Sequence, residues 1–284
     1  MLEDVGMTLP ASRSQIDALG DRLRKGDPRP GDEELLEAWL RKHDAALASV
    51  VEVLRTVELN DGSAAVPNSR VKTRGTLVEK LVREKSRLSA VQDVAGARIL
   101  VGPSLDTQDR VAAAVASKFS ESRVIDRRAD PRSGYRAVHV VVRHDECFVE
   151  VQVRTELQHL WAEAFERLAD RVGRQIRYGE PPPETSGGEP AGRLVHELLD
   201  FSGDVDHLER ADRTYAELAA RTDALGPAPK PPQTMWGRLW GRLRPDPDAE
   251  AAVSLAELSD SLLNLRDLMT AGLTDLRATL HDKR

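Results

Sequence analysis

The chain has 284 residues, of which 40% are hydrophobic and 31% charged, and its formal net charge is −6. This length suits one large domain or two smaller ones, and the acidic balance argues against nonspecific nucleic-acid binding as the main activity. The single cysteine excludes an internal disulfide and a cysteine-rich zinc site. No apolar run approaches the ~18 residues of a membrane span. The N-terminus lacks the features of a signal peptide, so we expect a cytoplasmic protein.

The first predicted elements are two helices, over residues 12–25 and 33–58. In the second helix, Leu36, Leu40 and Leu54 belong to a set of apolar residues that recur at helical spacing. The sequence NDGSAAVPNS, residues 60–69, is rich in turn formers and ends this part of the chain. Residues 1–60 are therefore expected to form an N-terminal helical segment.

Helices and strands alternate over the next part of the chain. The expected order is a helix at 75–88, a strand at 95–101, a helix at 105–119, strands at 122–126, 136–143 and 147–154, and a long helix from Thr155. RHDE, residues 143–146, fits the turn of a hairpin between the last two strands. Cys147 opens the last strand, which indicates a buried structural thiol rather than a nucleophile. The order predicts an α+β fold, a mixed β-sheet flanked by helices, with its core at residues 61–178.

The C-terminal part begins with a linker by composition, GEPPPETSGGEP at residues 179–190, and residues 191–284 read as a helical region. Its last helix carries a seam with spacings of three and four, formed by Leu255, Leu258, Leu262, Leu265, Met269, Leu273, Leu276 and Leu280. Packing of this seam inside the chain is favoured over a coiled-coil dimer. MWGRLWGRLRP, residues 235–245, has one apolar face. Three interpretations of this segment stay open: a helix that caps the core, a surface that binds a partner or a membrane, and a lid that neutralises a toxic active site.

Apolar and polar side chains alternate strictly in VEVQVRT, residues 149–155. The valines share one face of a strand, and the other face carries Glu150, Gln152 and Arg154. If the last two strands pair as a hairpin, Tyr135 and His139 join that polar face. A solvated outer face explains three polar positions. Five such positions, beside an acidic residue and a basic helix, indicate a site for a polyphosphate.

A basic block lies at residues 69–99, with eight arginines and lysines against three acidic residues. In an acidic protein such a block indicates an anionic ligand, although a solvated helix face with i,i+4 ion pairs explains it equally well. Within the block, Asp93 precedes a short strand that contains small residues. Asp93 is either a turn residue or a carboxylate that binds a metal.

Five motifs follow one another at compatible spacing: RVKT with TL and KL, DVAGARI, GYRAVH, EVQVRT and WAE. Together they resemble the synthetase domain of the RelA/SpoT family, which builds the alarmones ppGpp and pppGpp, and the resemblance covers residues 35–178. It implies a nucleotidyltransferase-like fold with helical N- and C-terminal extensions. It also implies transfer of the β,γ-pyrophosphate of ATP to the 3′-hydroxyl of GDP or GTP.

The resemblance assigns roles to individual residues. Asp93 and Glu150 are expected to bind Mg²⁺, and Glu150 is expected to activate the acceptor hydroxyl. The expected ATP-binding residues are Arg70, Lys72, Lys80 and Arg98, of which the arginines hold the adenine. The expected acceptor-binding residues are Tyr135, which stacks on guanine, and His139, Gln152, Arg154 and His159.

The first departure from the large bifunctional relatives concerns their hydrolase half, which needs several His and Asp ligands. Only one HD pair, His43 with Asp44, precedes the core here, and we interpret it as a chance occurrence. We therefore expect a small, stand-alone synthetase without a hydrolase domain.

The second departure concerns the acceptor. His159 stands where small alarmone synthetases often carry an asparagine. The sequence around it, ELQHLWAEAFERLAD, resembles toxin-type members of the family, some of which pyrophosphorylate the 3′-end of tRNA instead. A nearby cluster suits an RNA backbone or the 5′-phosphates of GDP or GTP, and consists of Arg123, Arg127, Arg128, Arg132 and Arg136. The expected partners are ATP with GDP or GTP, with tRNA as the alternative, and a neutralising antitoxin or a second copy of the chain. A nucleotide-binding module without activity is a third interpretation, against which the joint presence of carboxylates and basic residues argues.

Overall fold

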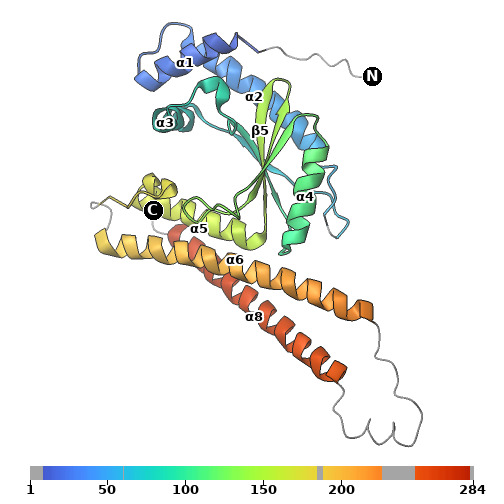
Figure 1. The fold of residues 1–284 in the computed structure, drawn as a ribbon. Coiled ribbons are helices and arrows are strands. Elements are labelled where there is room, and N and C mark those ends of the chain that lie inside the picture. The colour runs from blue at the N-terminus through green and yellow to red at the C-terminus, as the bar shows by residue number, and fades with distance from the viewer. Residues whose placement is uncertain (1–8, 60, 184–187, 226–246, 282–284) are drawn as a thin grey trace, which may run out of the picture. The chain divides into compact units, whose positions relative to one another are not determined.

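The computed structural model describes residues 9–59, 61–183, 188–225 and 247–281 (Figure 1). The chain divides into two compact units. Unit 1 comprises Met1–Gly102, Asp106–Pro131 and Tyr135–Glu156, and unit 2 comprises Pro103–Leu105, Arg132–Gly134 and Leu157–Arg284. No helix in the described ranges is both long enough and apolar enough to cross a membrane.

Unit 1 is built on a five-stranded sheet with the order β1-β2-β5-β4-β3. The strands are β1 (Asn68–Val71), β2 (Ala95–Leu100), β3 (Ser122–Asp126), β4 (Val138–His144) and β5 (Cys147–Arg154). β2 and β5 are parallel, and every other neighbouring pair is antiparallel. The predicted α+β fold with a mixed sheet is confirmed. The short edge strand β1 was not predicted, because its residues follow a turn-rich stretch and have little apolar alternation.

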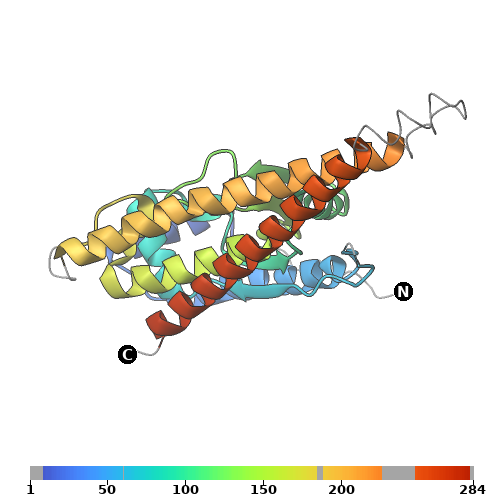
Figure 2. The same ribbon diagram turned by 90° about the horizontal axis from the view of Figure 1, so that it is seen from below.

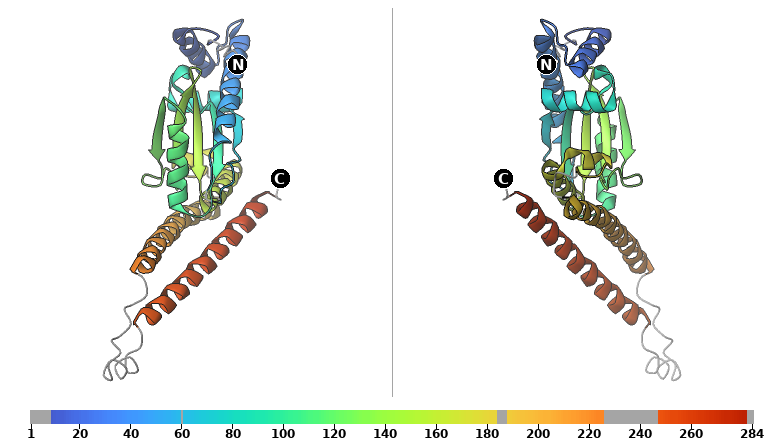
Figure 3. Two further views of the ribbon diagram at one scale, coloured as in Figure 1. Left: turned by 90° about the vertical axis from the view of Figure 1, so that its right-hand side faces the viewer. Right: turned by 90° about the vertical axis from the view of Figure 1, so that its left-hand side faces the viewer.

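One face of the sheet is apolar and carries the core of unit 1. Val149, Val151 and Val153 are fully buried there, as the alternation of β5 predicts. The helices α2 (Asp32–Leu54) and α4 (Leu105–Ser117) contribute residues to the same cluster, so both cover this face. Figure 3 shows α2 lying along the strands. The opposite face is thereby left to the polar residues of the same strands.

A second apolar cluster joins α1 (Arg13–Lys25), α3 (Arg74–Glu84) and the short helix η1 (Leu88–Ala90) to α2. The close approach of α1 to η1 depends on Gly20, where an added Cβ would lie 2.6 Å from the Cβ of Leu88. This packing fixes α3 and the chain that leads into β2.

The β4–β5 hairpin sets the register of the polar face. Its two turn residues, Asp145 and Glu146, have φ values of 47° and 65°, as a type I′ turn requires. With this turn His139 lies opposite Gln152, and Val141 lies opposite Glu150. The predicted hairpin is confirmed, whereas Tyr135 lies in the loop before β4 and does not begin the strand.

Unit 2 is helical and contains α5 (Glu156–Val172), η2 (Arg174–Tyr178), α6 (Gly188–Leu225) and α8 (Pro247–His281). α8 packs against α6 within the chain, and an ion pair joins Arg266 to Asp212 (Figure 2). Of the predicted seam, Met269 and Leu273 are buried, whereas Leu265 is 47% exposed. The Trp-containing segment 235–245 and part of the predicted linker 179–190 lie outside the described residues. The predicted domain boundaries remain predictions.

Candidate active site

The polar face of the sheet gathers most of the residues expected to form a site. Cross-strand partners point to the same side, so the register of the four strand pairs defines this face. Its members among the expected residues are Arg70 on β1, Arg98 on β2, His139 on β4, and Glu150, Gln152 and Arg154 on β5. The prediction that the polar residues of β4 and β5 share one side of one sheet is confirmed.

Four of these side chains and Tyr135, from the loop before β4, form a closed hydrogen-bonded ring, which we call the polar ring: Tyr135, His139, Glu150, Gln152 and Arg154. Two of its bonds end on the carboxylate of Glu150. His139 Nδ1 lies 3.0 Å from Oε1, and Gln152 Nε2 donates to Oε2 at 2.8 Å. A carboxylate only accepts, so His139 Nδ1 carries a proton.

Arg154 closes the ring on the side opposite Glu150. Its Nη2 donates to the Gln152 side-chain oxygen at 2.7 Å and to the Tyr135 hydroxyl at 3.0 Å. The same guanidinium lies over the Tyr135 ring, 4.9 Å from the centroid. The Tyr135 hydroxyl is 2.9 Å from His139 Nε2 and donates to it when the imidazole is neutral. Both arms of the ring then run from Arg154 as donor to Glu150 as final acceptor.

The ring keeps Glu150 ionised although only 16% of its side chain is exposed. Burial alone would raise the pKa of this carboxyl. The hydrogen bond and the positive charge of His139, the hydrogen bond from Gln152 and the charge of Lys80 outweigh burial and lower the pKa from 4.5 to about 2. Glu150 therefore carries a full negative charge at any physiological pH.

Asp93 forms a second anionic centre, at the entrance to β2. Its Oδ2 lies 2.9 Å from Lys80 Nζ and 3.3 Å from Lys72 Nζ. Its Oδ1 is buried and accepts no hydrogen bond from the described residues. Burial alone would lower the pKa of Lys80, but Asp93 and Glu84 outweigh it and raise that pKa. Because Lys80 also acts on Glu150, the two carboxylates share one cation.

Arg70 and Arg98 occupy diagonal positions on neighbouring strands, because Arg70 pairs with Gly96 and Arg98 pairs with Asn68. Gly96 also pairs with Glu150, so it lies in the row between Arg70 and Glu150. A glycine there carries no side chain into the space above the sheet, which leaves room for a flat ligand close to the backbone.

The arginine cluster after β3 is mostly engaged in structure. Arg128 is 11% exposed and binds the carboxylates of Asp109 and Asp126 at 2.5 and 2.7 Å. Arg136 donates to the backbone oxygen of Arg128 at 2.7 Å. Arg123 donates to the side-chain oxygen of Gln92 at 2.8 Å, at the polar face. The sequence predicted that these arginines bind an RNA backbone or the 5′-phosphates of GDP or GTP. In the structure, Arg128 instead holds a loop in place.

Two further histidines lie apart from the polar ring. His159 belongs to α5 in unit 2, where its Nε2 is 3.5 Å from Glu163 Oε1, so its expected acceptor role remains a prediction. His43 is buried in α2, and its Nδ1 bonds to the backbone oxygen of Trp39 at 2.9 Å. Sequence reasoning also missed Glu84, which lies 3.4 Å from Lys80 Nζ, although the i,i+4 spacing was a signal for it.

The chain is similar to several known proteins. The family description "Region found in RelA / SpoT proteins" matches residues 69–168, which include all of β1 but its first residue, β2 to β5 and most of α5. Uncharacterized proteins of Mycobacterium bovis and Mycobacterium tuberculosis are 36% identical over 260 residues, covering 87% of this chain and 92% of theirs.

Among solved structures, small alarmone synthetase 1 from Bacillus subtilis is 21% identical with a TM-score of 0.49, covering 66% of this chain and 98% of that one. The complex between the Type VI effector Tas1 and its immunity protein gives 16% identity and a TM-score of 0.36, covering 69% of this chain and 98% of that one. The family match and the long sequence relatives lead to one conclusion: the chain belongs to the RelA/SpoT-type synthetase domain family.

Proposed function

We propose that the protein is a pyrophosphokinase, which transfers the β,γ-pyrophosphate of ATP to the 3′-hydroxyl of GDP or GTP. The observation that carries the proposal is the polar ring, in which two chains of donors end on an ionised Glu150. Such a centre accepts a proton from a hydroxyl placed above the sheet. Cations and a second carboxylate stand beside it, as a polyphosphate donor requires.

The donor nucleotide would bind over β1 and β2. Residues at diagonal positions lie roughly 7–8 Å apart, so Arg70 and Arg98 are spaced to receive one planar base between their guanidinium groups. Lys72 and Lys80, now held by Asp93, would turn to the phosphates and neutralise their charge. Charge neutralisation and alignment are the main requirements of phosphoryl transfer, so these residues supply what the reaction needs.

The residues present fit the Mg²⁺ ion that the family implies. Mg²⁺ in nucleotide sites is typically held by one or two carboxylates, with phosphate oxygens and water completing the shell. Asp93 offers a buried oxygen that has no partner among the described residues, and Glu150 offers a charged one. No group of three or more candidate ligands occurs in the described part of the chain, so the phosphates would complete the shell. When bound, the ion would neutralise the charge of the transferring phosphates.

The acceptor would bind over β4 and β5. Tyr135 would stack on its guanine. Arg154 holds the Tyr135 ring in place, because its guanidinium donates to the phenol hydroxyl and also lies over one face of the ring. The 3′-oxygen attacks the β-phosphorus of ATP, the bond from that phosphorus to the α,β-bridging oxygen breaks, and AMP leaves. The hydroxyl proton passes to Glu150. A carboxylate with a pKa of about 2 is a weak base, so it takes this proton late, once the new bond to phosphorus has made the hydroxyl acidic.

The test is an acceptor assay. Purified protein is incubated with Mg²⁺, γ-labelled ATP and GDP, GTP or uncharged tRNA, each separately. We expect label on the guanosine nucleotide, and Glu150→Gln should abolish it while Glu37→Gln, the same change at an exposed position of α2, leaves it unchanged. Label on tRNA alone would reject the proposal in favour of a toxin-type activity. No label on any acceptor would indicate a nucleotide-binding module without activity.

A further inference from the structure

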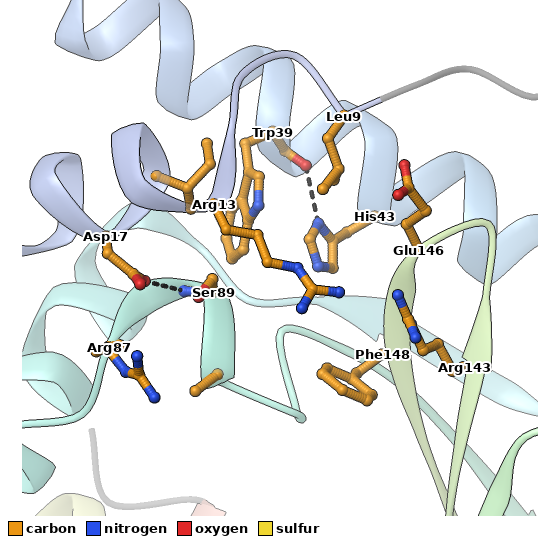
Figure 4. Close-up of a pocket in the computed structure, with 12 residues that line it drawn as sticks. Leu9, Arg13, Asp17, Trp39, His43, Arg87, Ser89, Arg143, Glu146 and Phe148 are labelled. Carbon is orange, nitrogen blue, oxygen red and sulfur yellow. Dashed lines mark hydrogen bonds between the residues drawn. The ribbon is translucent and has the colours of Figure 1, made fainter.

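A cavity of about 330 Å³ lies in unit 1, beyond the polar ring on the same side of the sheet. It is bounded by the start of α1, the middle of α2, η1 and the β4–β5 hairpin (Figure 4). Arg143 pairs with Phe148 one row beyond the pair of Val141 with Glu150, so both point to the polar face and into this cavity. None of the residues assigned to the polar ring or to the Asp93 centre lines it.

Three arginines line the cavity, one from each of three elements. Arg13 and Arg87 have exposed side chains, and neither side chain makes an ion pair or a hydrogen bond with any described residue. Arg143 has one partner, Glu121, at 3.2 Å on the surface. Figure 4 shows the guanidinium groups of Arg13 and Arg143 pointing toward each other. Like charges so arranged repel each other unless an anion lies between them.

A hydrogen-bond acceptor on a buried residue faces the same space. His43 is 4% exposed, and its Nδ1 bonds to the Trp39 carbonyl at 2.9 Å, so Nδ1 carries the proton. Its Nε2 is then an acceptor in the neutral ring, and it has no partner among the described residues. Figure 4 shows this nitrogen on the lower side of the imidazole, within the cavity. Nε2 is not among the buried polar atoms that lack a partner, so it is reached from the cavity, where a ligand N–H would take the place of water.

Apart from Ser89, the remaining lining residues are apolar, aromatic or acidic. Phe148 presents a ring surface, whereas Trp39 is 3% exposed and packs against the His43 ring with a centroid distance of 4.1 Å. Asp17 already accepts the Ser89 backbone N–H at 3.0 Å. Glu146, exposed at the hairpin turn, is a further acceptor at the rim. The cavity therefore combines cations, flat apolar surface and acceptors for N–H groups.

We propose that this cavity is a second ligand site, which binds a purine nucleoside monophosphate. The phosphate lies between Arg13 and Arg143, with Arg87 farther out at the rim, and the base lies against Phe148 with an N–H donated to His43 Nε2. The volume stands at the lower end of small-molecule pockets, which suits one nucleoside monophosphate rather than a longer nucleotide. The proposal concerns binding and does not rest on the pyrophosphokinase activity.

The test is calorimetric titration of the full-length protein with GMP, AMP and inorganic phosphate. We expect Arg13→Ala/Arg87→Ala to weaken binding of the monophosphate at least tenfold. The control is Arg41→Ala/Arg55→Ala, which removes two exposed arginines of α2 outside the cavity and should change nothing. Comparison of GMP with AMP identifies the preferred base. Unchanged affinity in Arg13→Ala/Arg87→Ala would overturn the site.

A second variant tests the nucleoside part of the proposal. His43→Phe keeps an aromatic ring of similar size and removes the Nε2 acceptor. We expect weaker binding of the nucleoside monophosphate, and unchanged binding of inorganic phosphate. Equal affinity of the wild-type protein for phosphate and for both monophosphates would show that the base is not recognised, and would overturn the assignment. Because Arg13 and Arg87 are exposed, their double variant decides the question even where His43→Phe fails to fold.

Discussion

Replacing Glu150 by glutamine tests the polar ring most directly. The change keeps the shape of the side chain, removes its charge and places an NH₂ group against one of two donors, His139 Nδ1 or Gln152 Nε2. Gln152 is unable to turn its amide to compensate, because its oxygen already accepts from Arg154 at 2.7 Å. The variant therefore behaves as a Glu150 that is permanently protonated.

The magnitude follows from the pKa of Glu150, which is about 2 in the folded protein against 4.5 for an unperturbed glutamate. A folded pKa below the unfolded one contributes stability that is complete above 4.5 and is lost as the pH falls toward 2. The shift corresponds to about 3 kcal/mol at pH 7. At pH 3 the Glu150 carboxylate is protonated in the unfolded state and mostly ionised in the folded state. About 2 kcal/mol of its contribution to the unfolding free energy is therefore lost.

The assay is urea unfolding of the wild-type protein and Glu150→Gln, followed by circular dichroism at pH 7 and pH 3. The difference in unfolding free energy should fall from about 3 kcal/mol at pH 7 to about 1 kcal/mol at pH 3. The loss of a general base should also lower turnover by roughly 10²- to 10⁴-fold. A difference that is the same at both pH values would refute the role of Glu150 as the final acceptor of the ring. Near wild-type turnover would remove it as the base.

Three further predictions concern separate parts of unit 1. Tyr135→Ala should weaken binding of the guanosine acceptor by about 5- to 150-fold through lost stacking and leave ATP binding unchanged, as measured by calorimetry; equal losses would contradict the stacking role. Arg128→Ala should lower the unfolding free energy by about 2 kcal/mol, because Asp109 and Asp126 lose their cation, without changing acceptor affinity. A change in affinity alone would assign Arg128 to the ligand instead. Cys147 is 1% exposed and burial raises its pKa to about 11, so iodoacetamide at pH 7.5 should label it only after unfolding. Rapid labelling of the folded protein would contradict this.

Much of the fold could be predicted because local patterns act within a few residues. The alternation in β5 placed its valines on the buried face, and the four-residue stretch between the last two strands predicted their hairpin. A strand with strict period two has one possible division of its side chains between two faces. The polar face therefore followed from the sequence as soon as β4 and β5 were taken to pair.

The parts that were not predicted depend on contacts between distant segments. β1 is a strand because it pairs with β2, and its own residues give a weak signal. The leucine seam of α8 predicted a buried stripe, yet Leu265 is 47% exposed, because it lines an open groove between α6 and α8 instead of closing against α6. Periodicity shows which residues lie on one side of a helix, whereas burial depends on what packs there.

The arginines show the same division at the level of charge. The sequence could count the cations near the site, but it could not tell which of them already had partners. Arg128 is neutralised by two carboxylates, whereas Arg87, one of the eight cations of the basic block, and Arg13, which raised no expectation, have none among the described residues. An ion pair requires two side chains to meet in space, and that meeting is set by the packing of several elements.

The sequence by itself determined the mixed sheet, the polar side of its central hairpin and the family to which the motifs point, since each depends on short-range order along the chain. Only the tertiary structure decided that Arg154 and Glu150 are the two ends of one ring of hydrogen bonds. It also decided that Asp93 shares Lys80 with Glu150, and that a second cavity lies beside them. The physical reason is that hydrogen bonds, charge pairs and cavities depend on distances between atoms, which are fixed only when separate elements pack together.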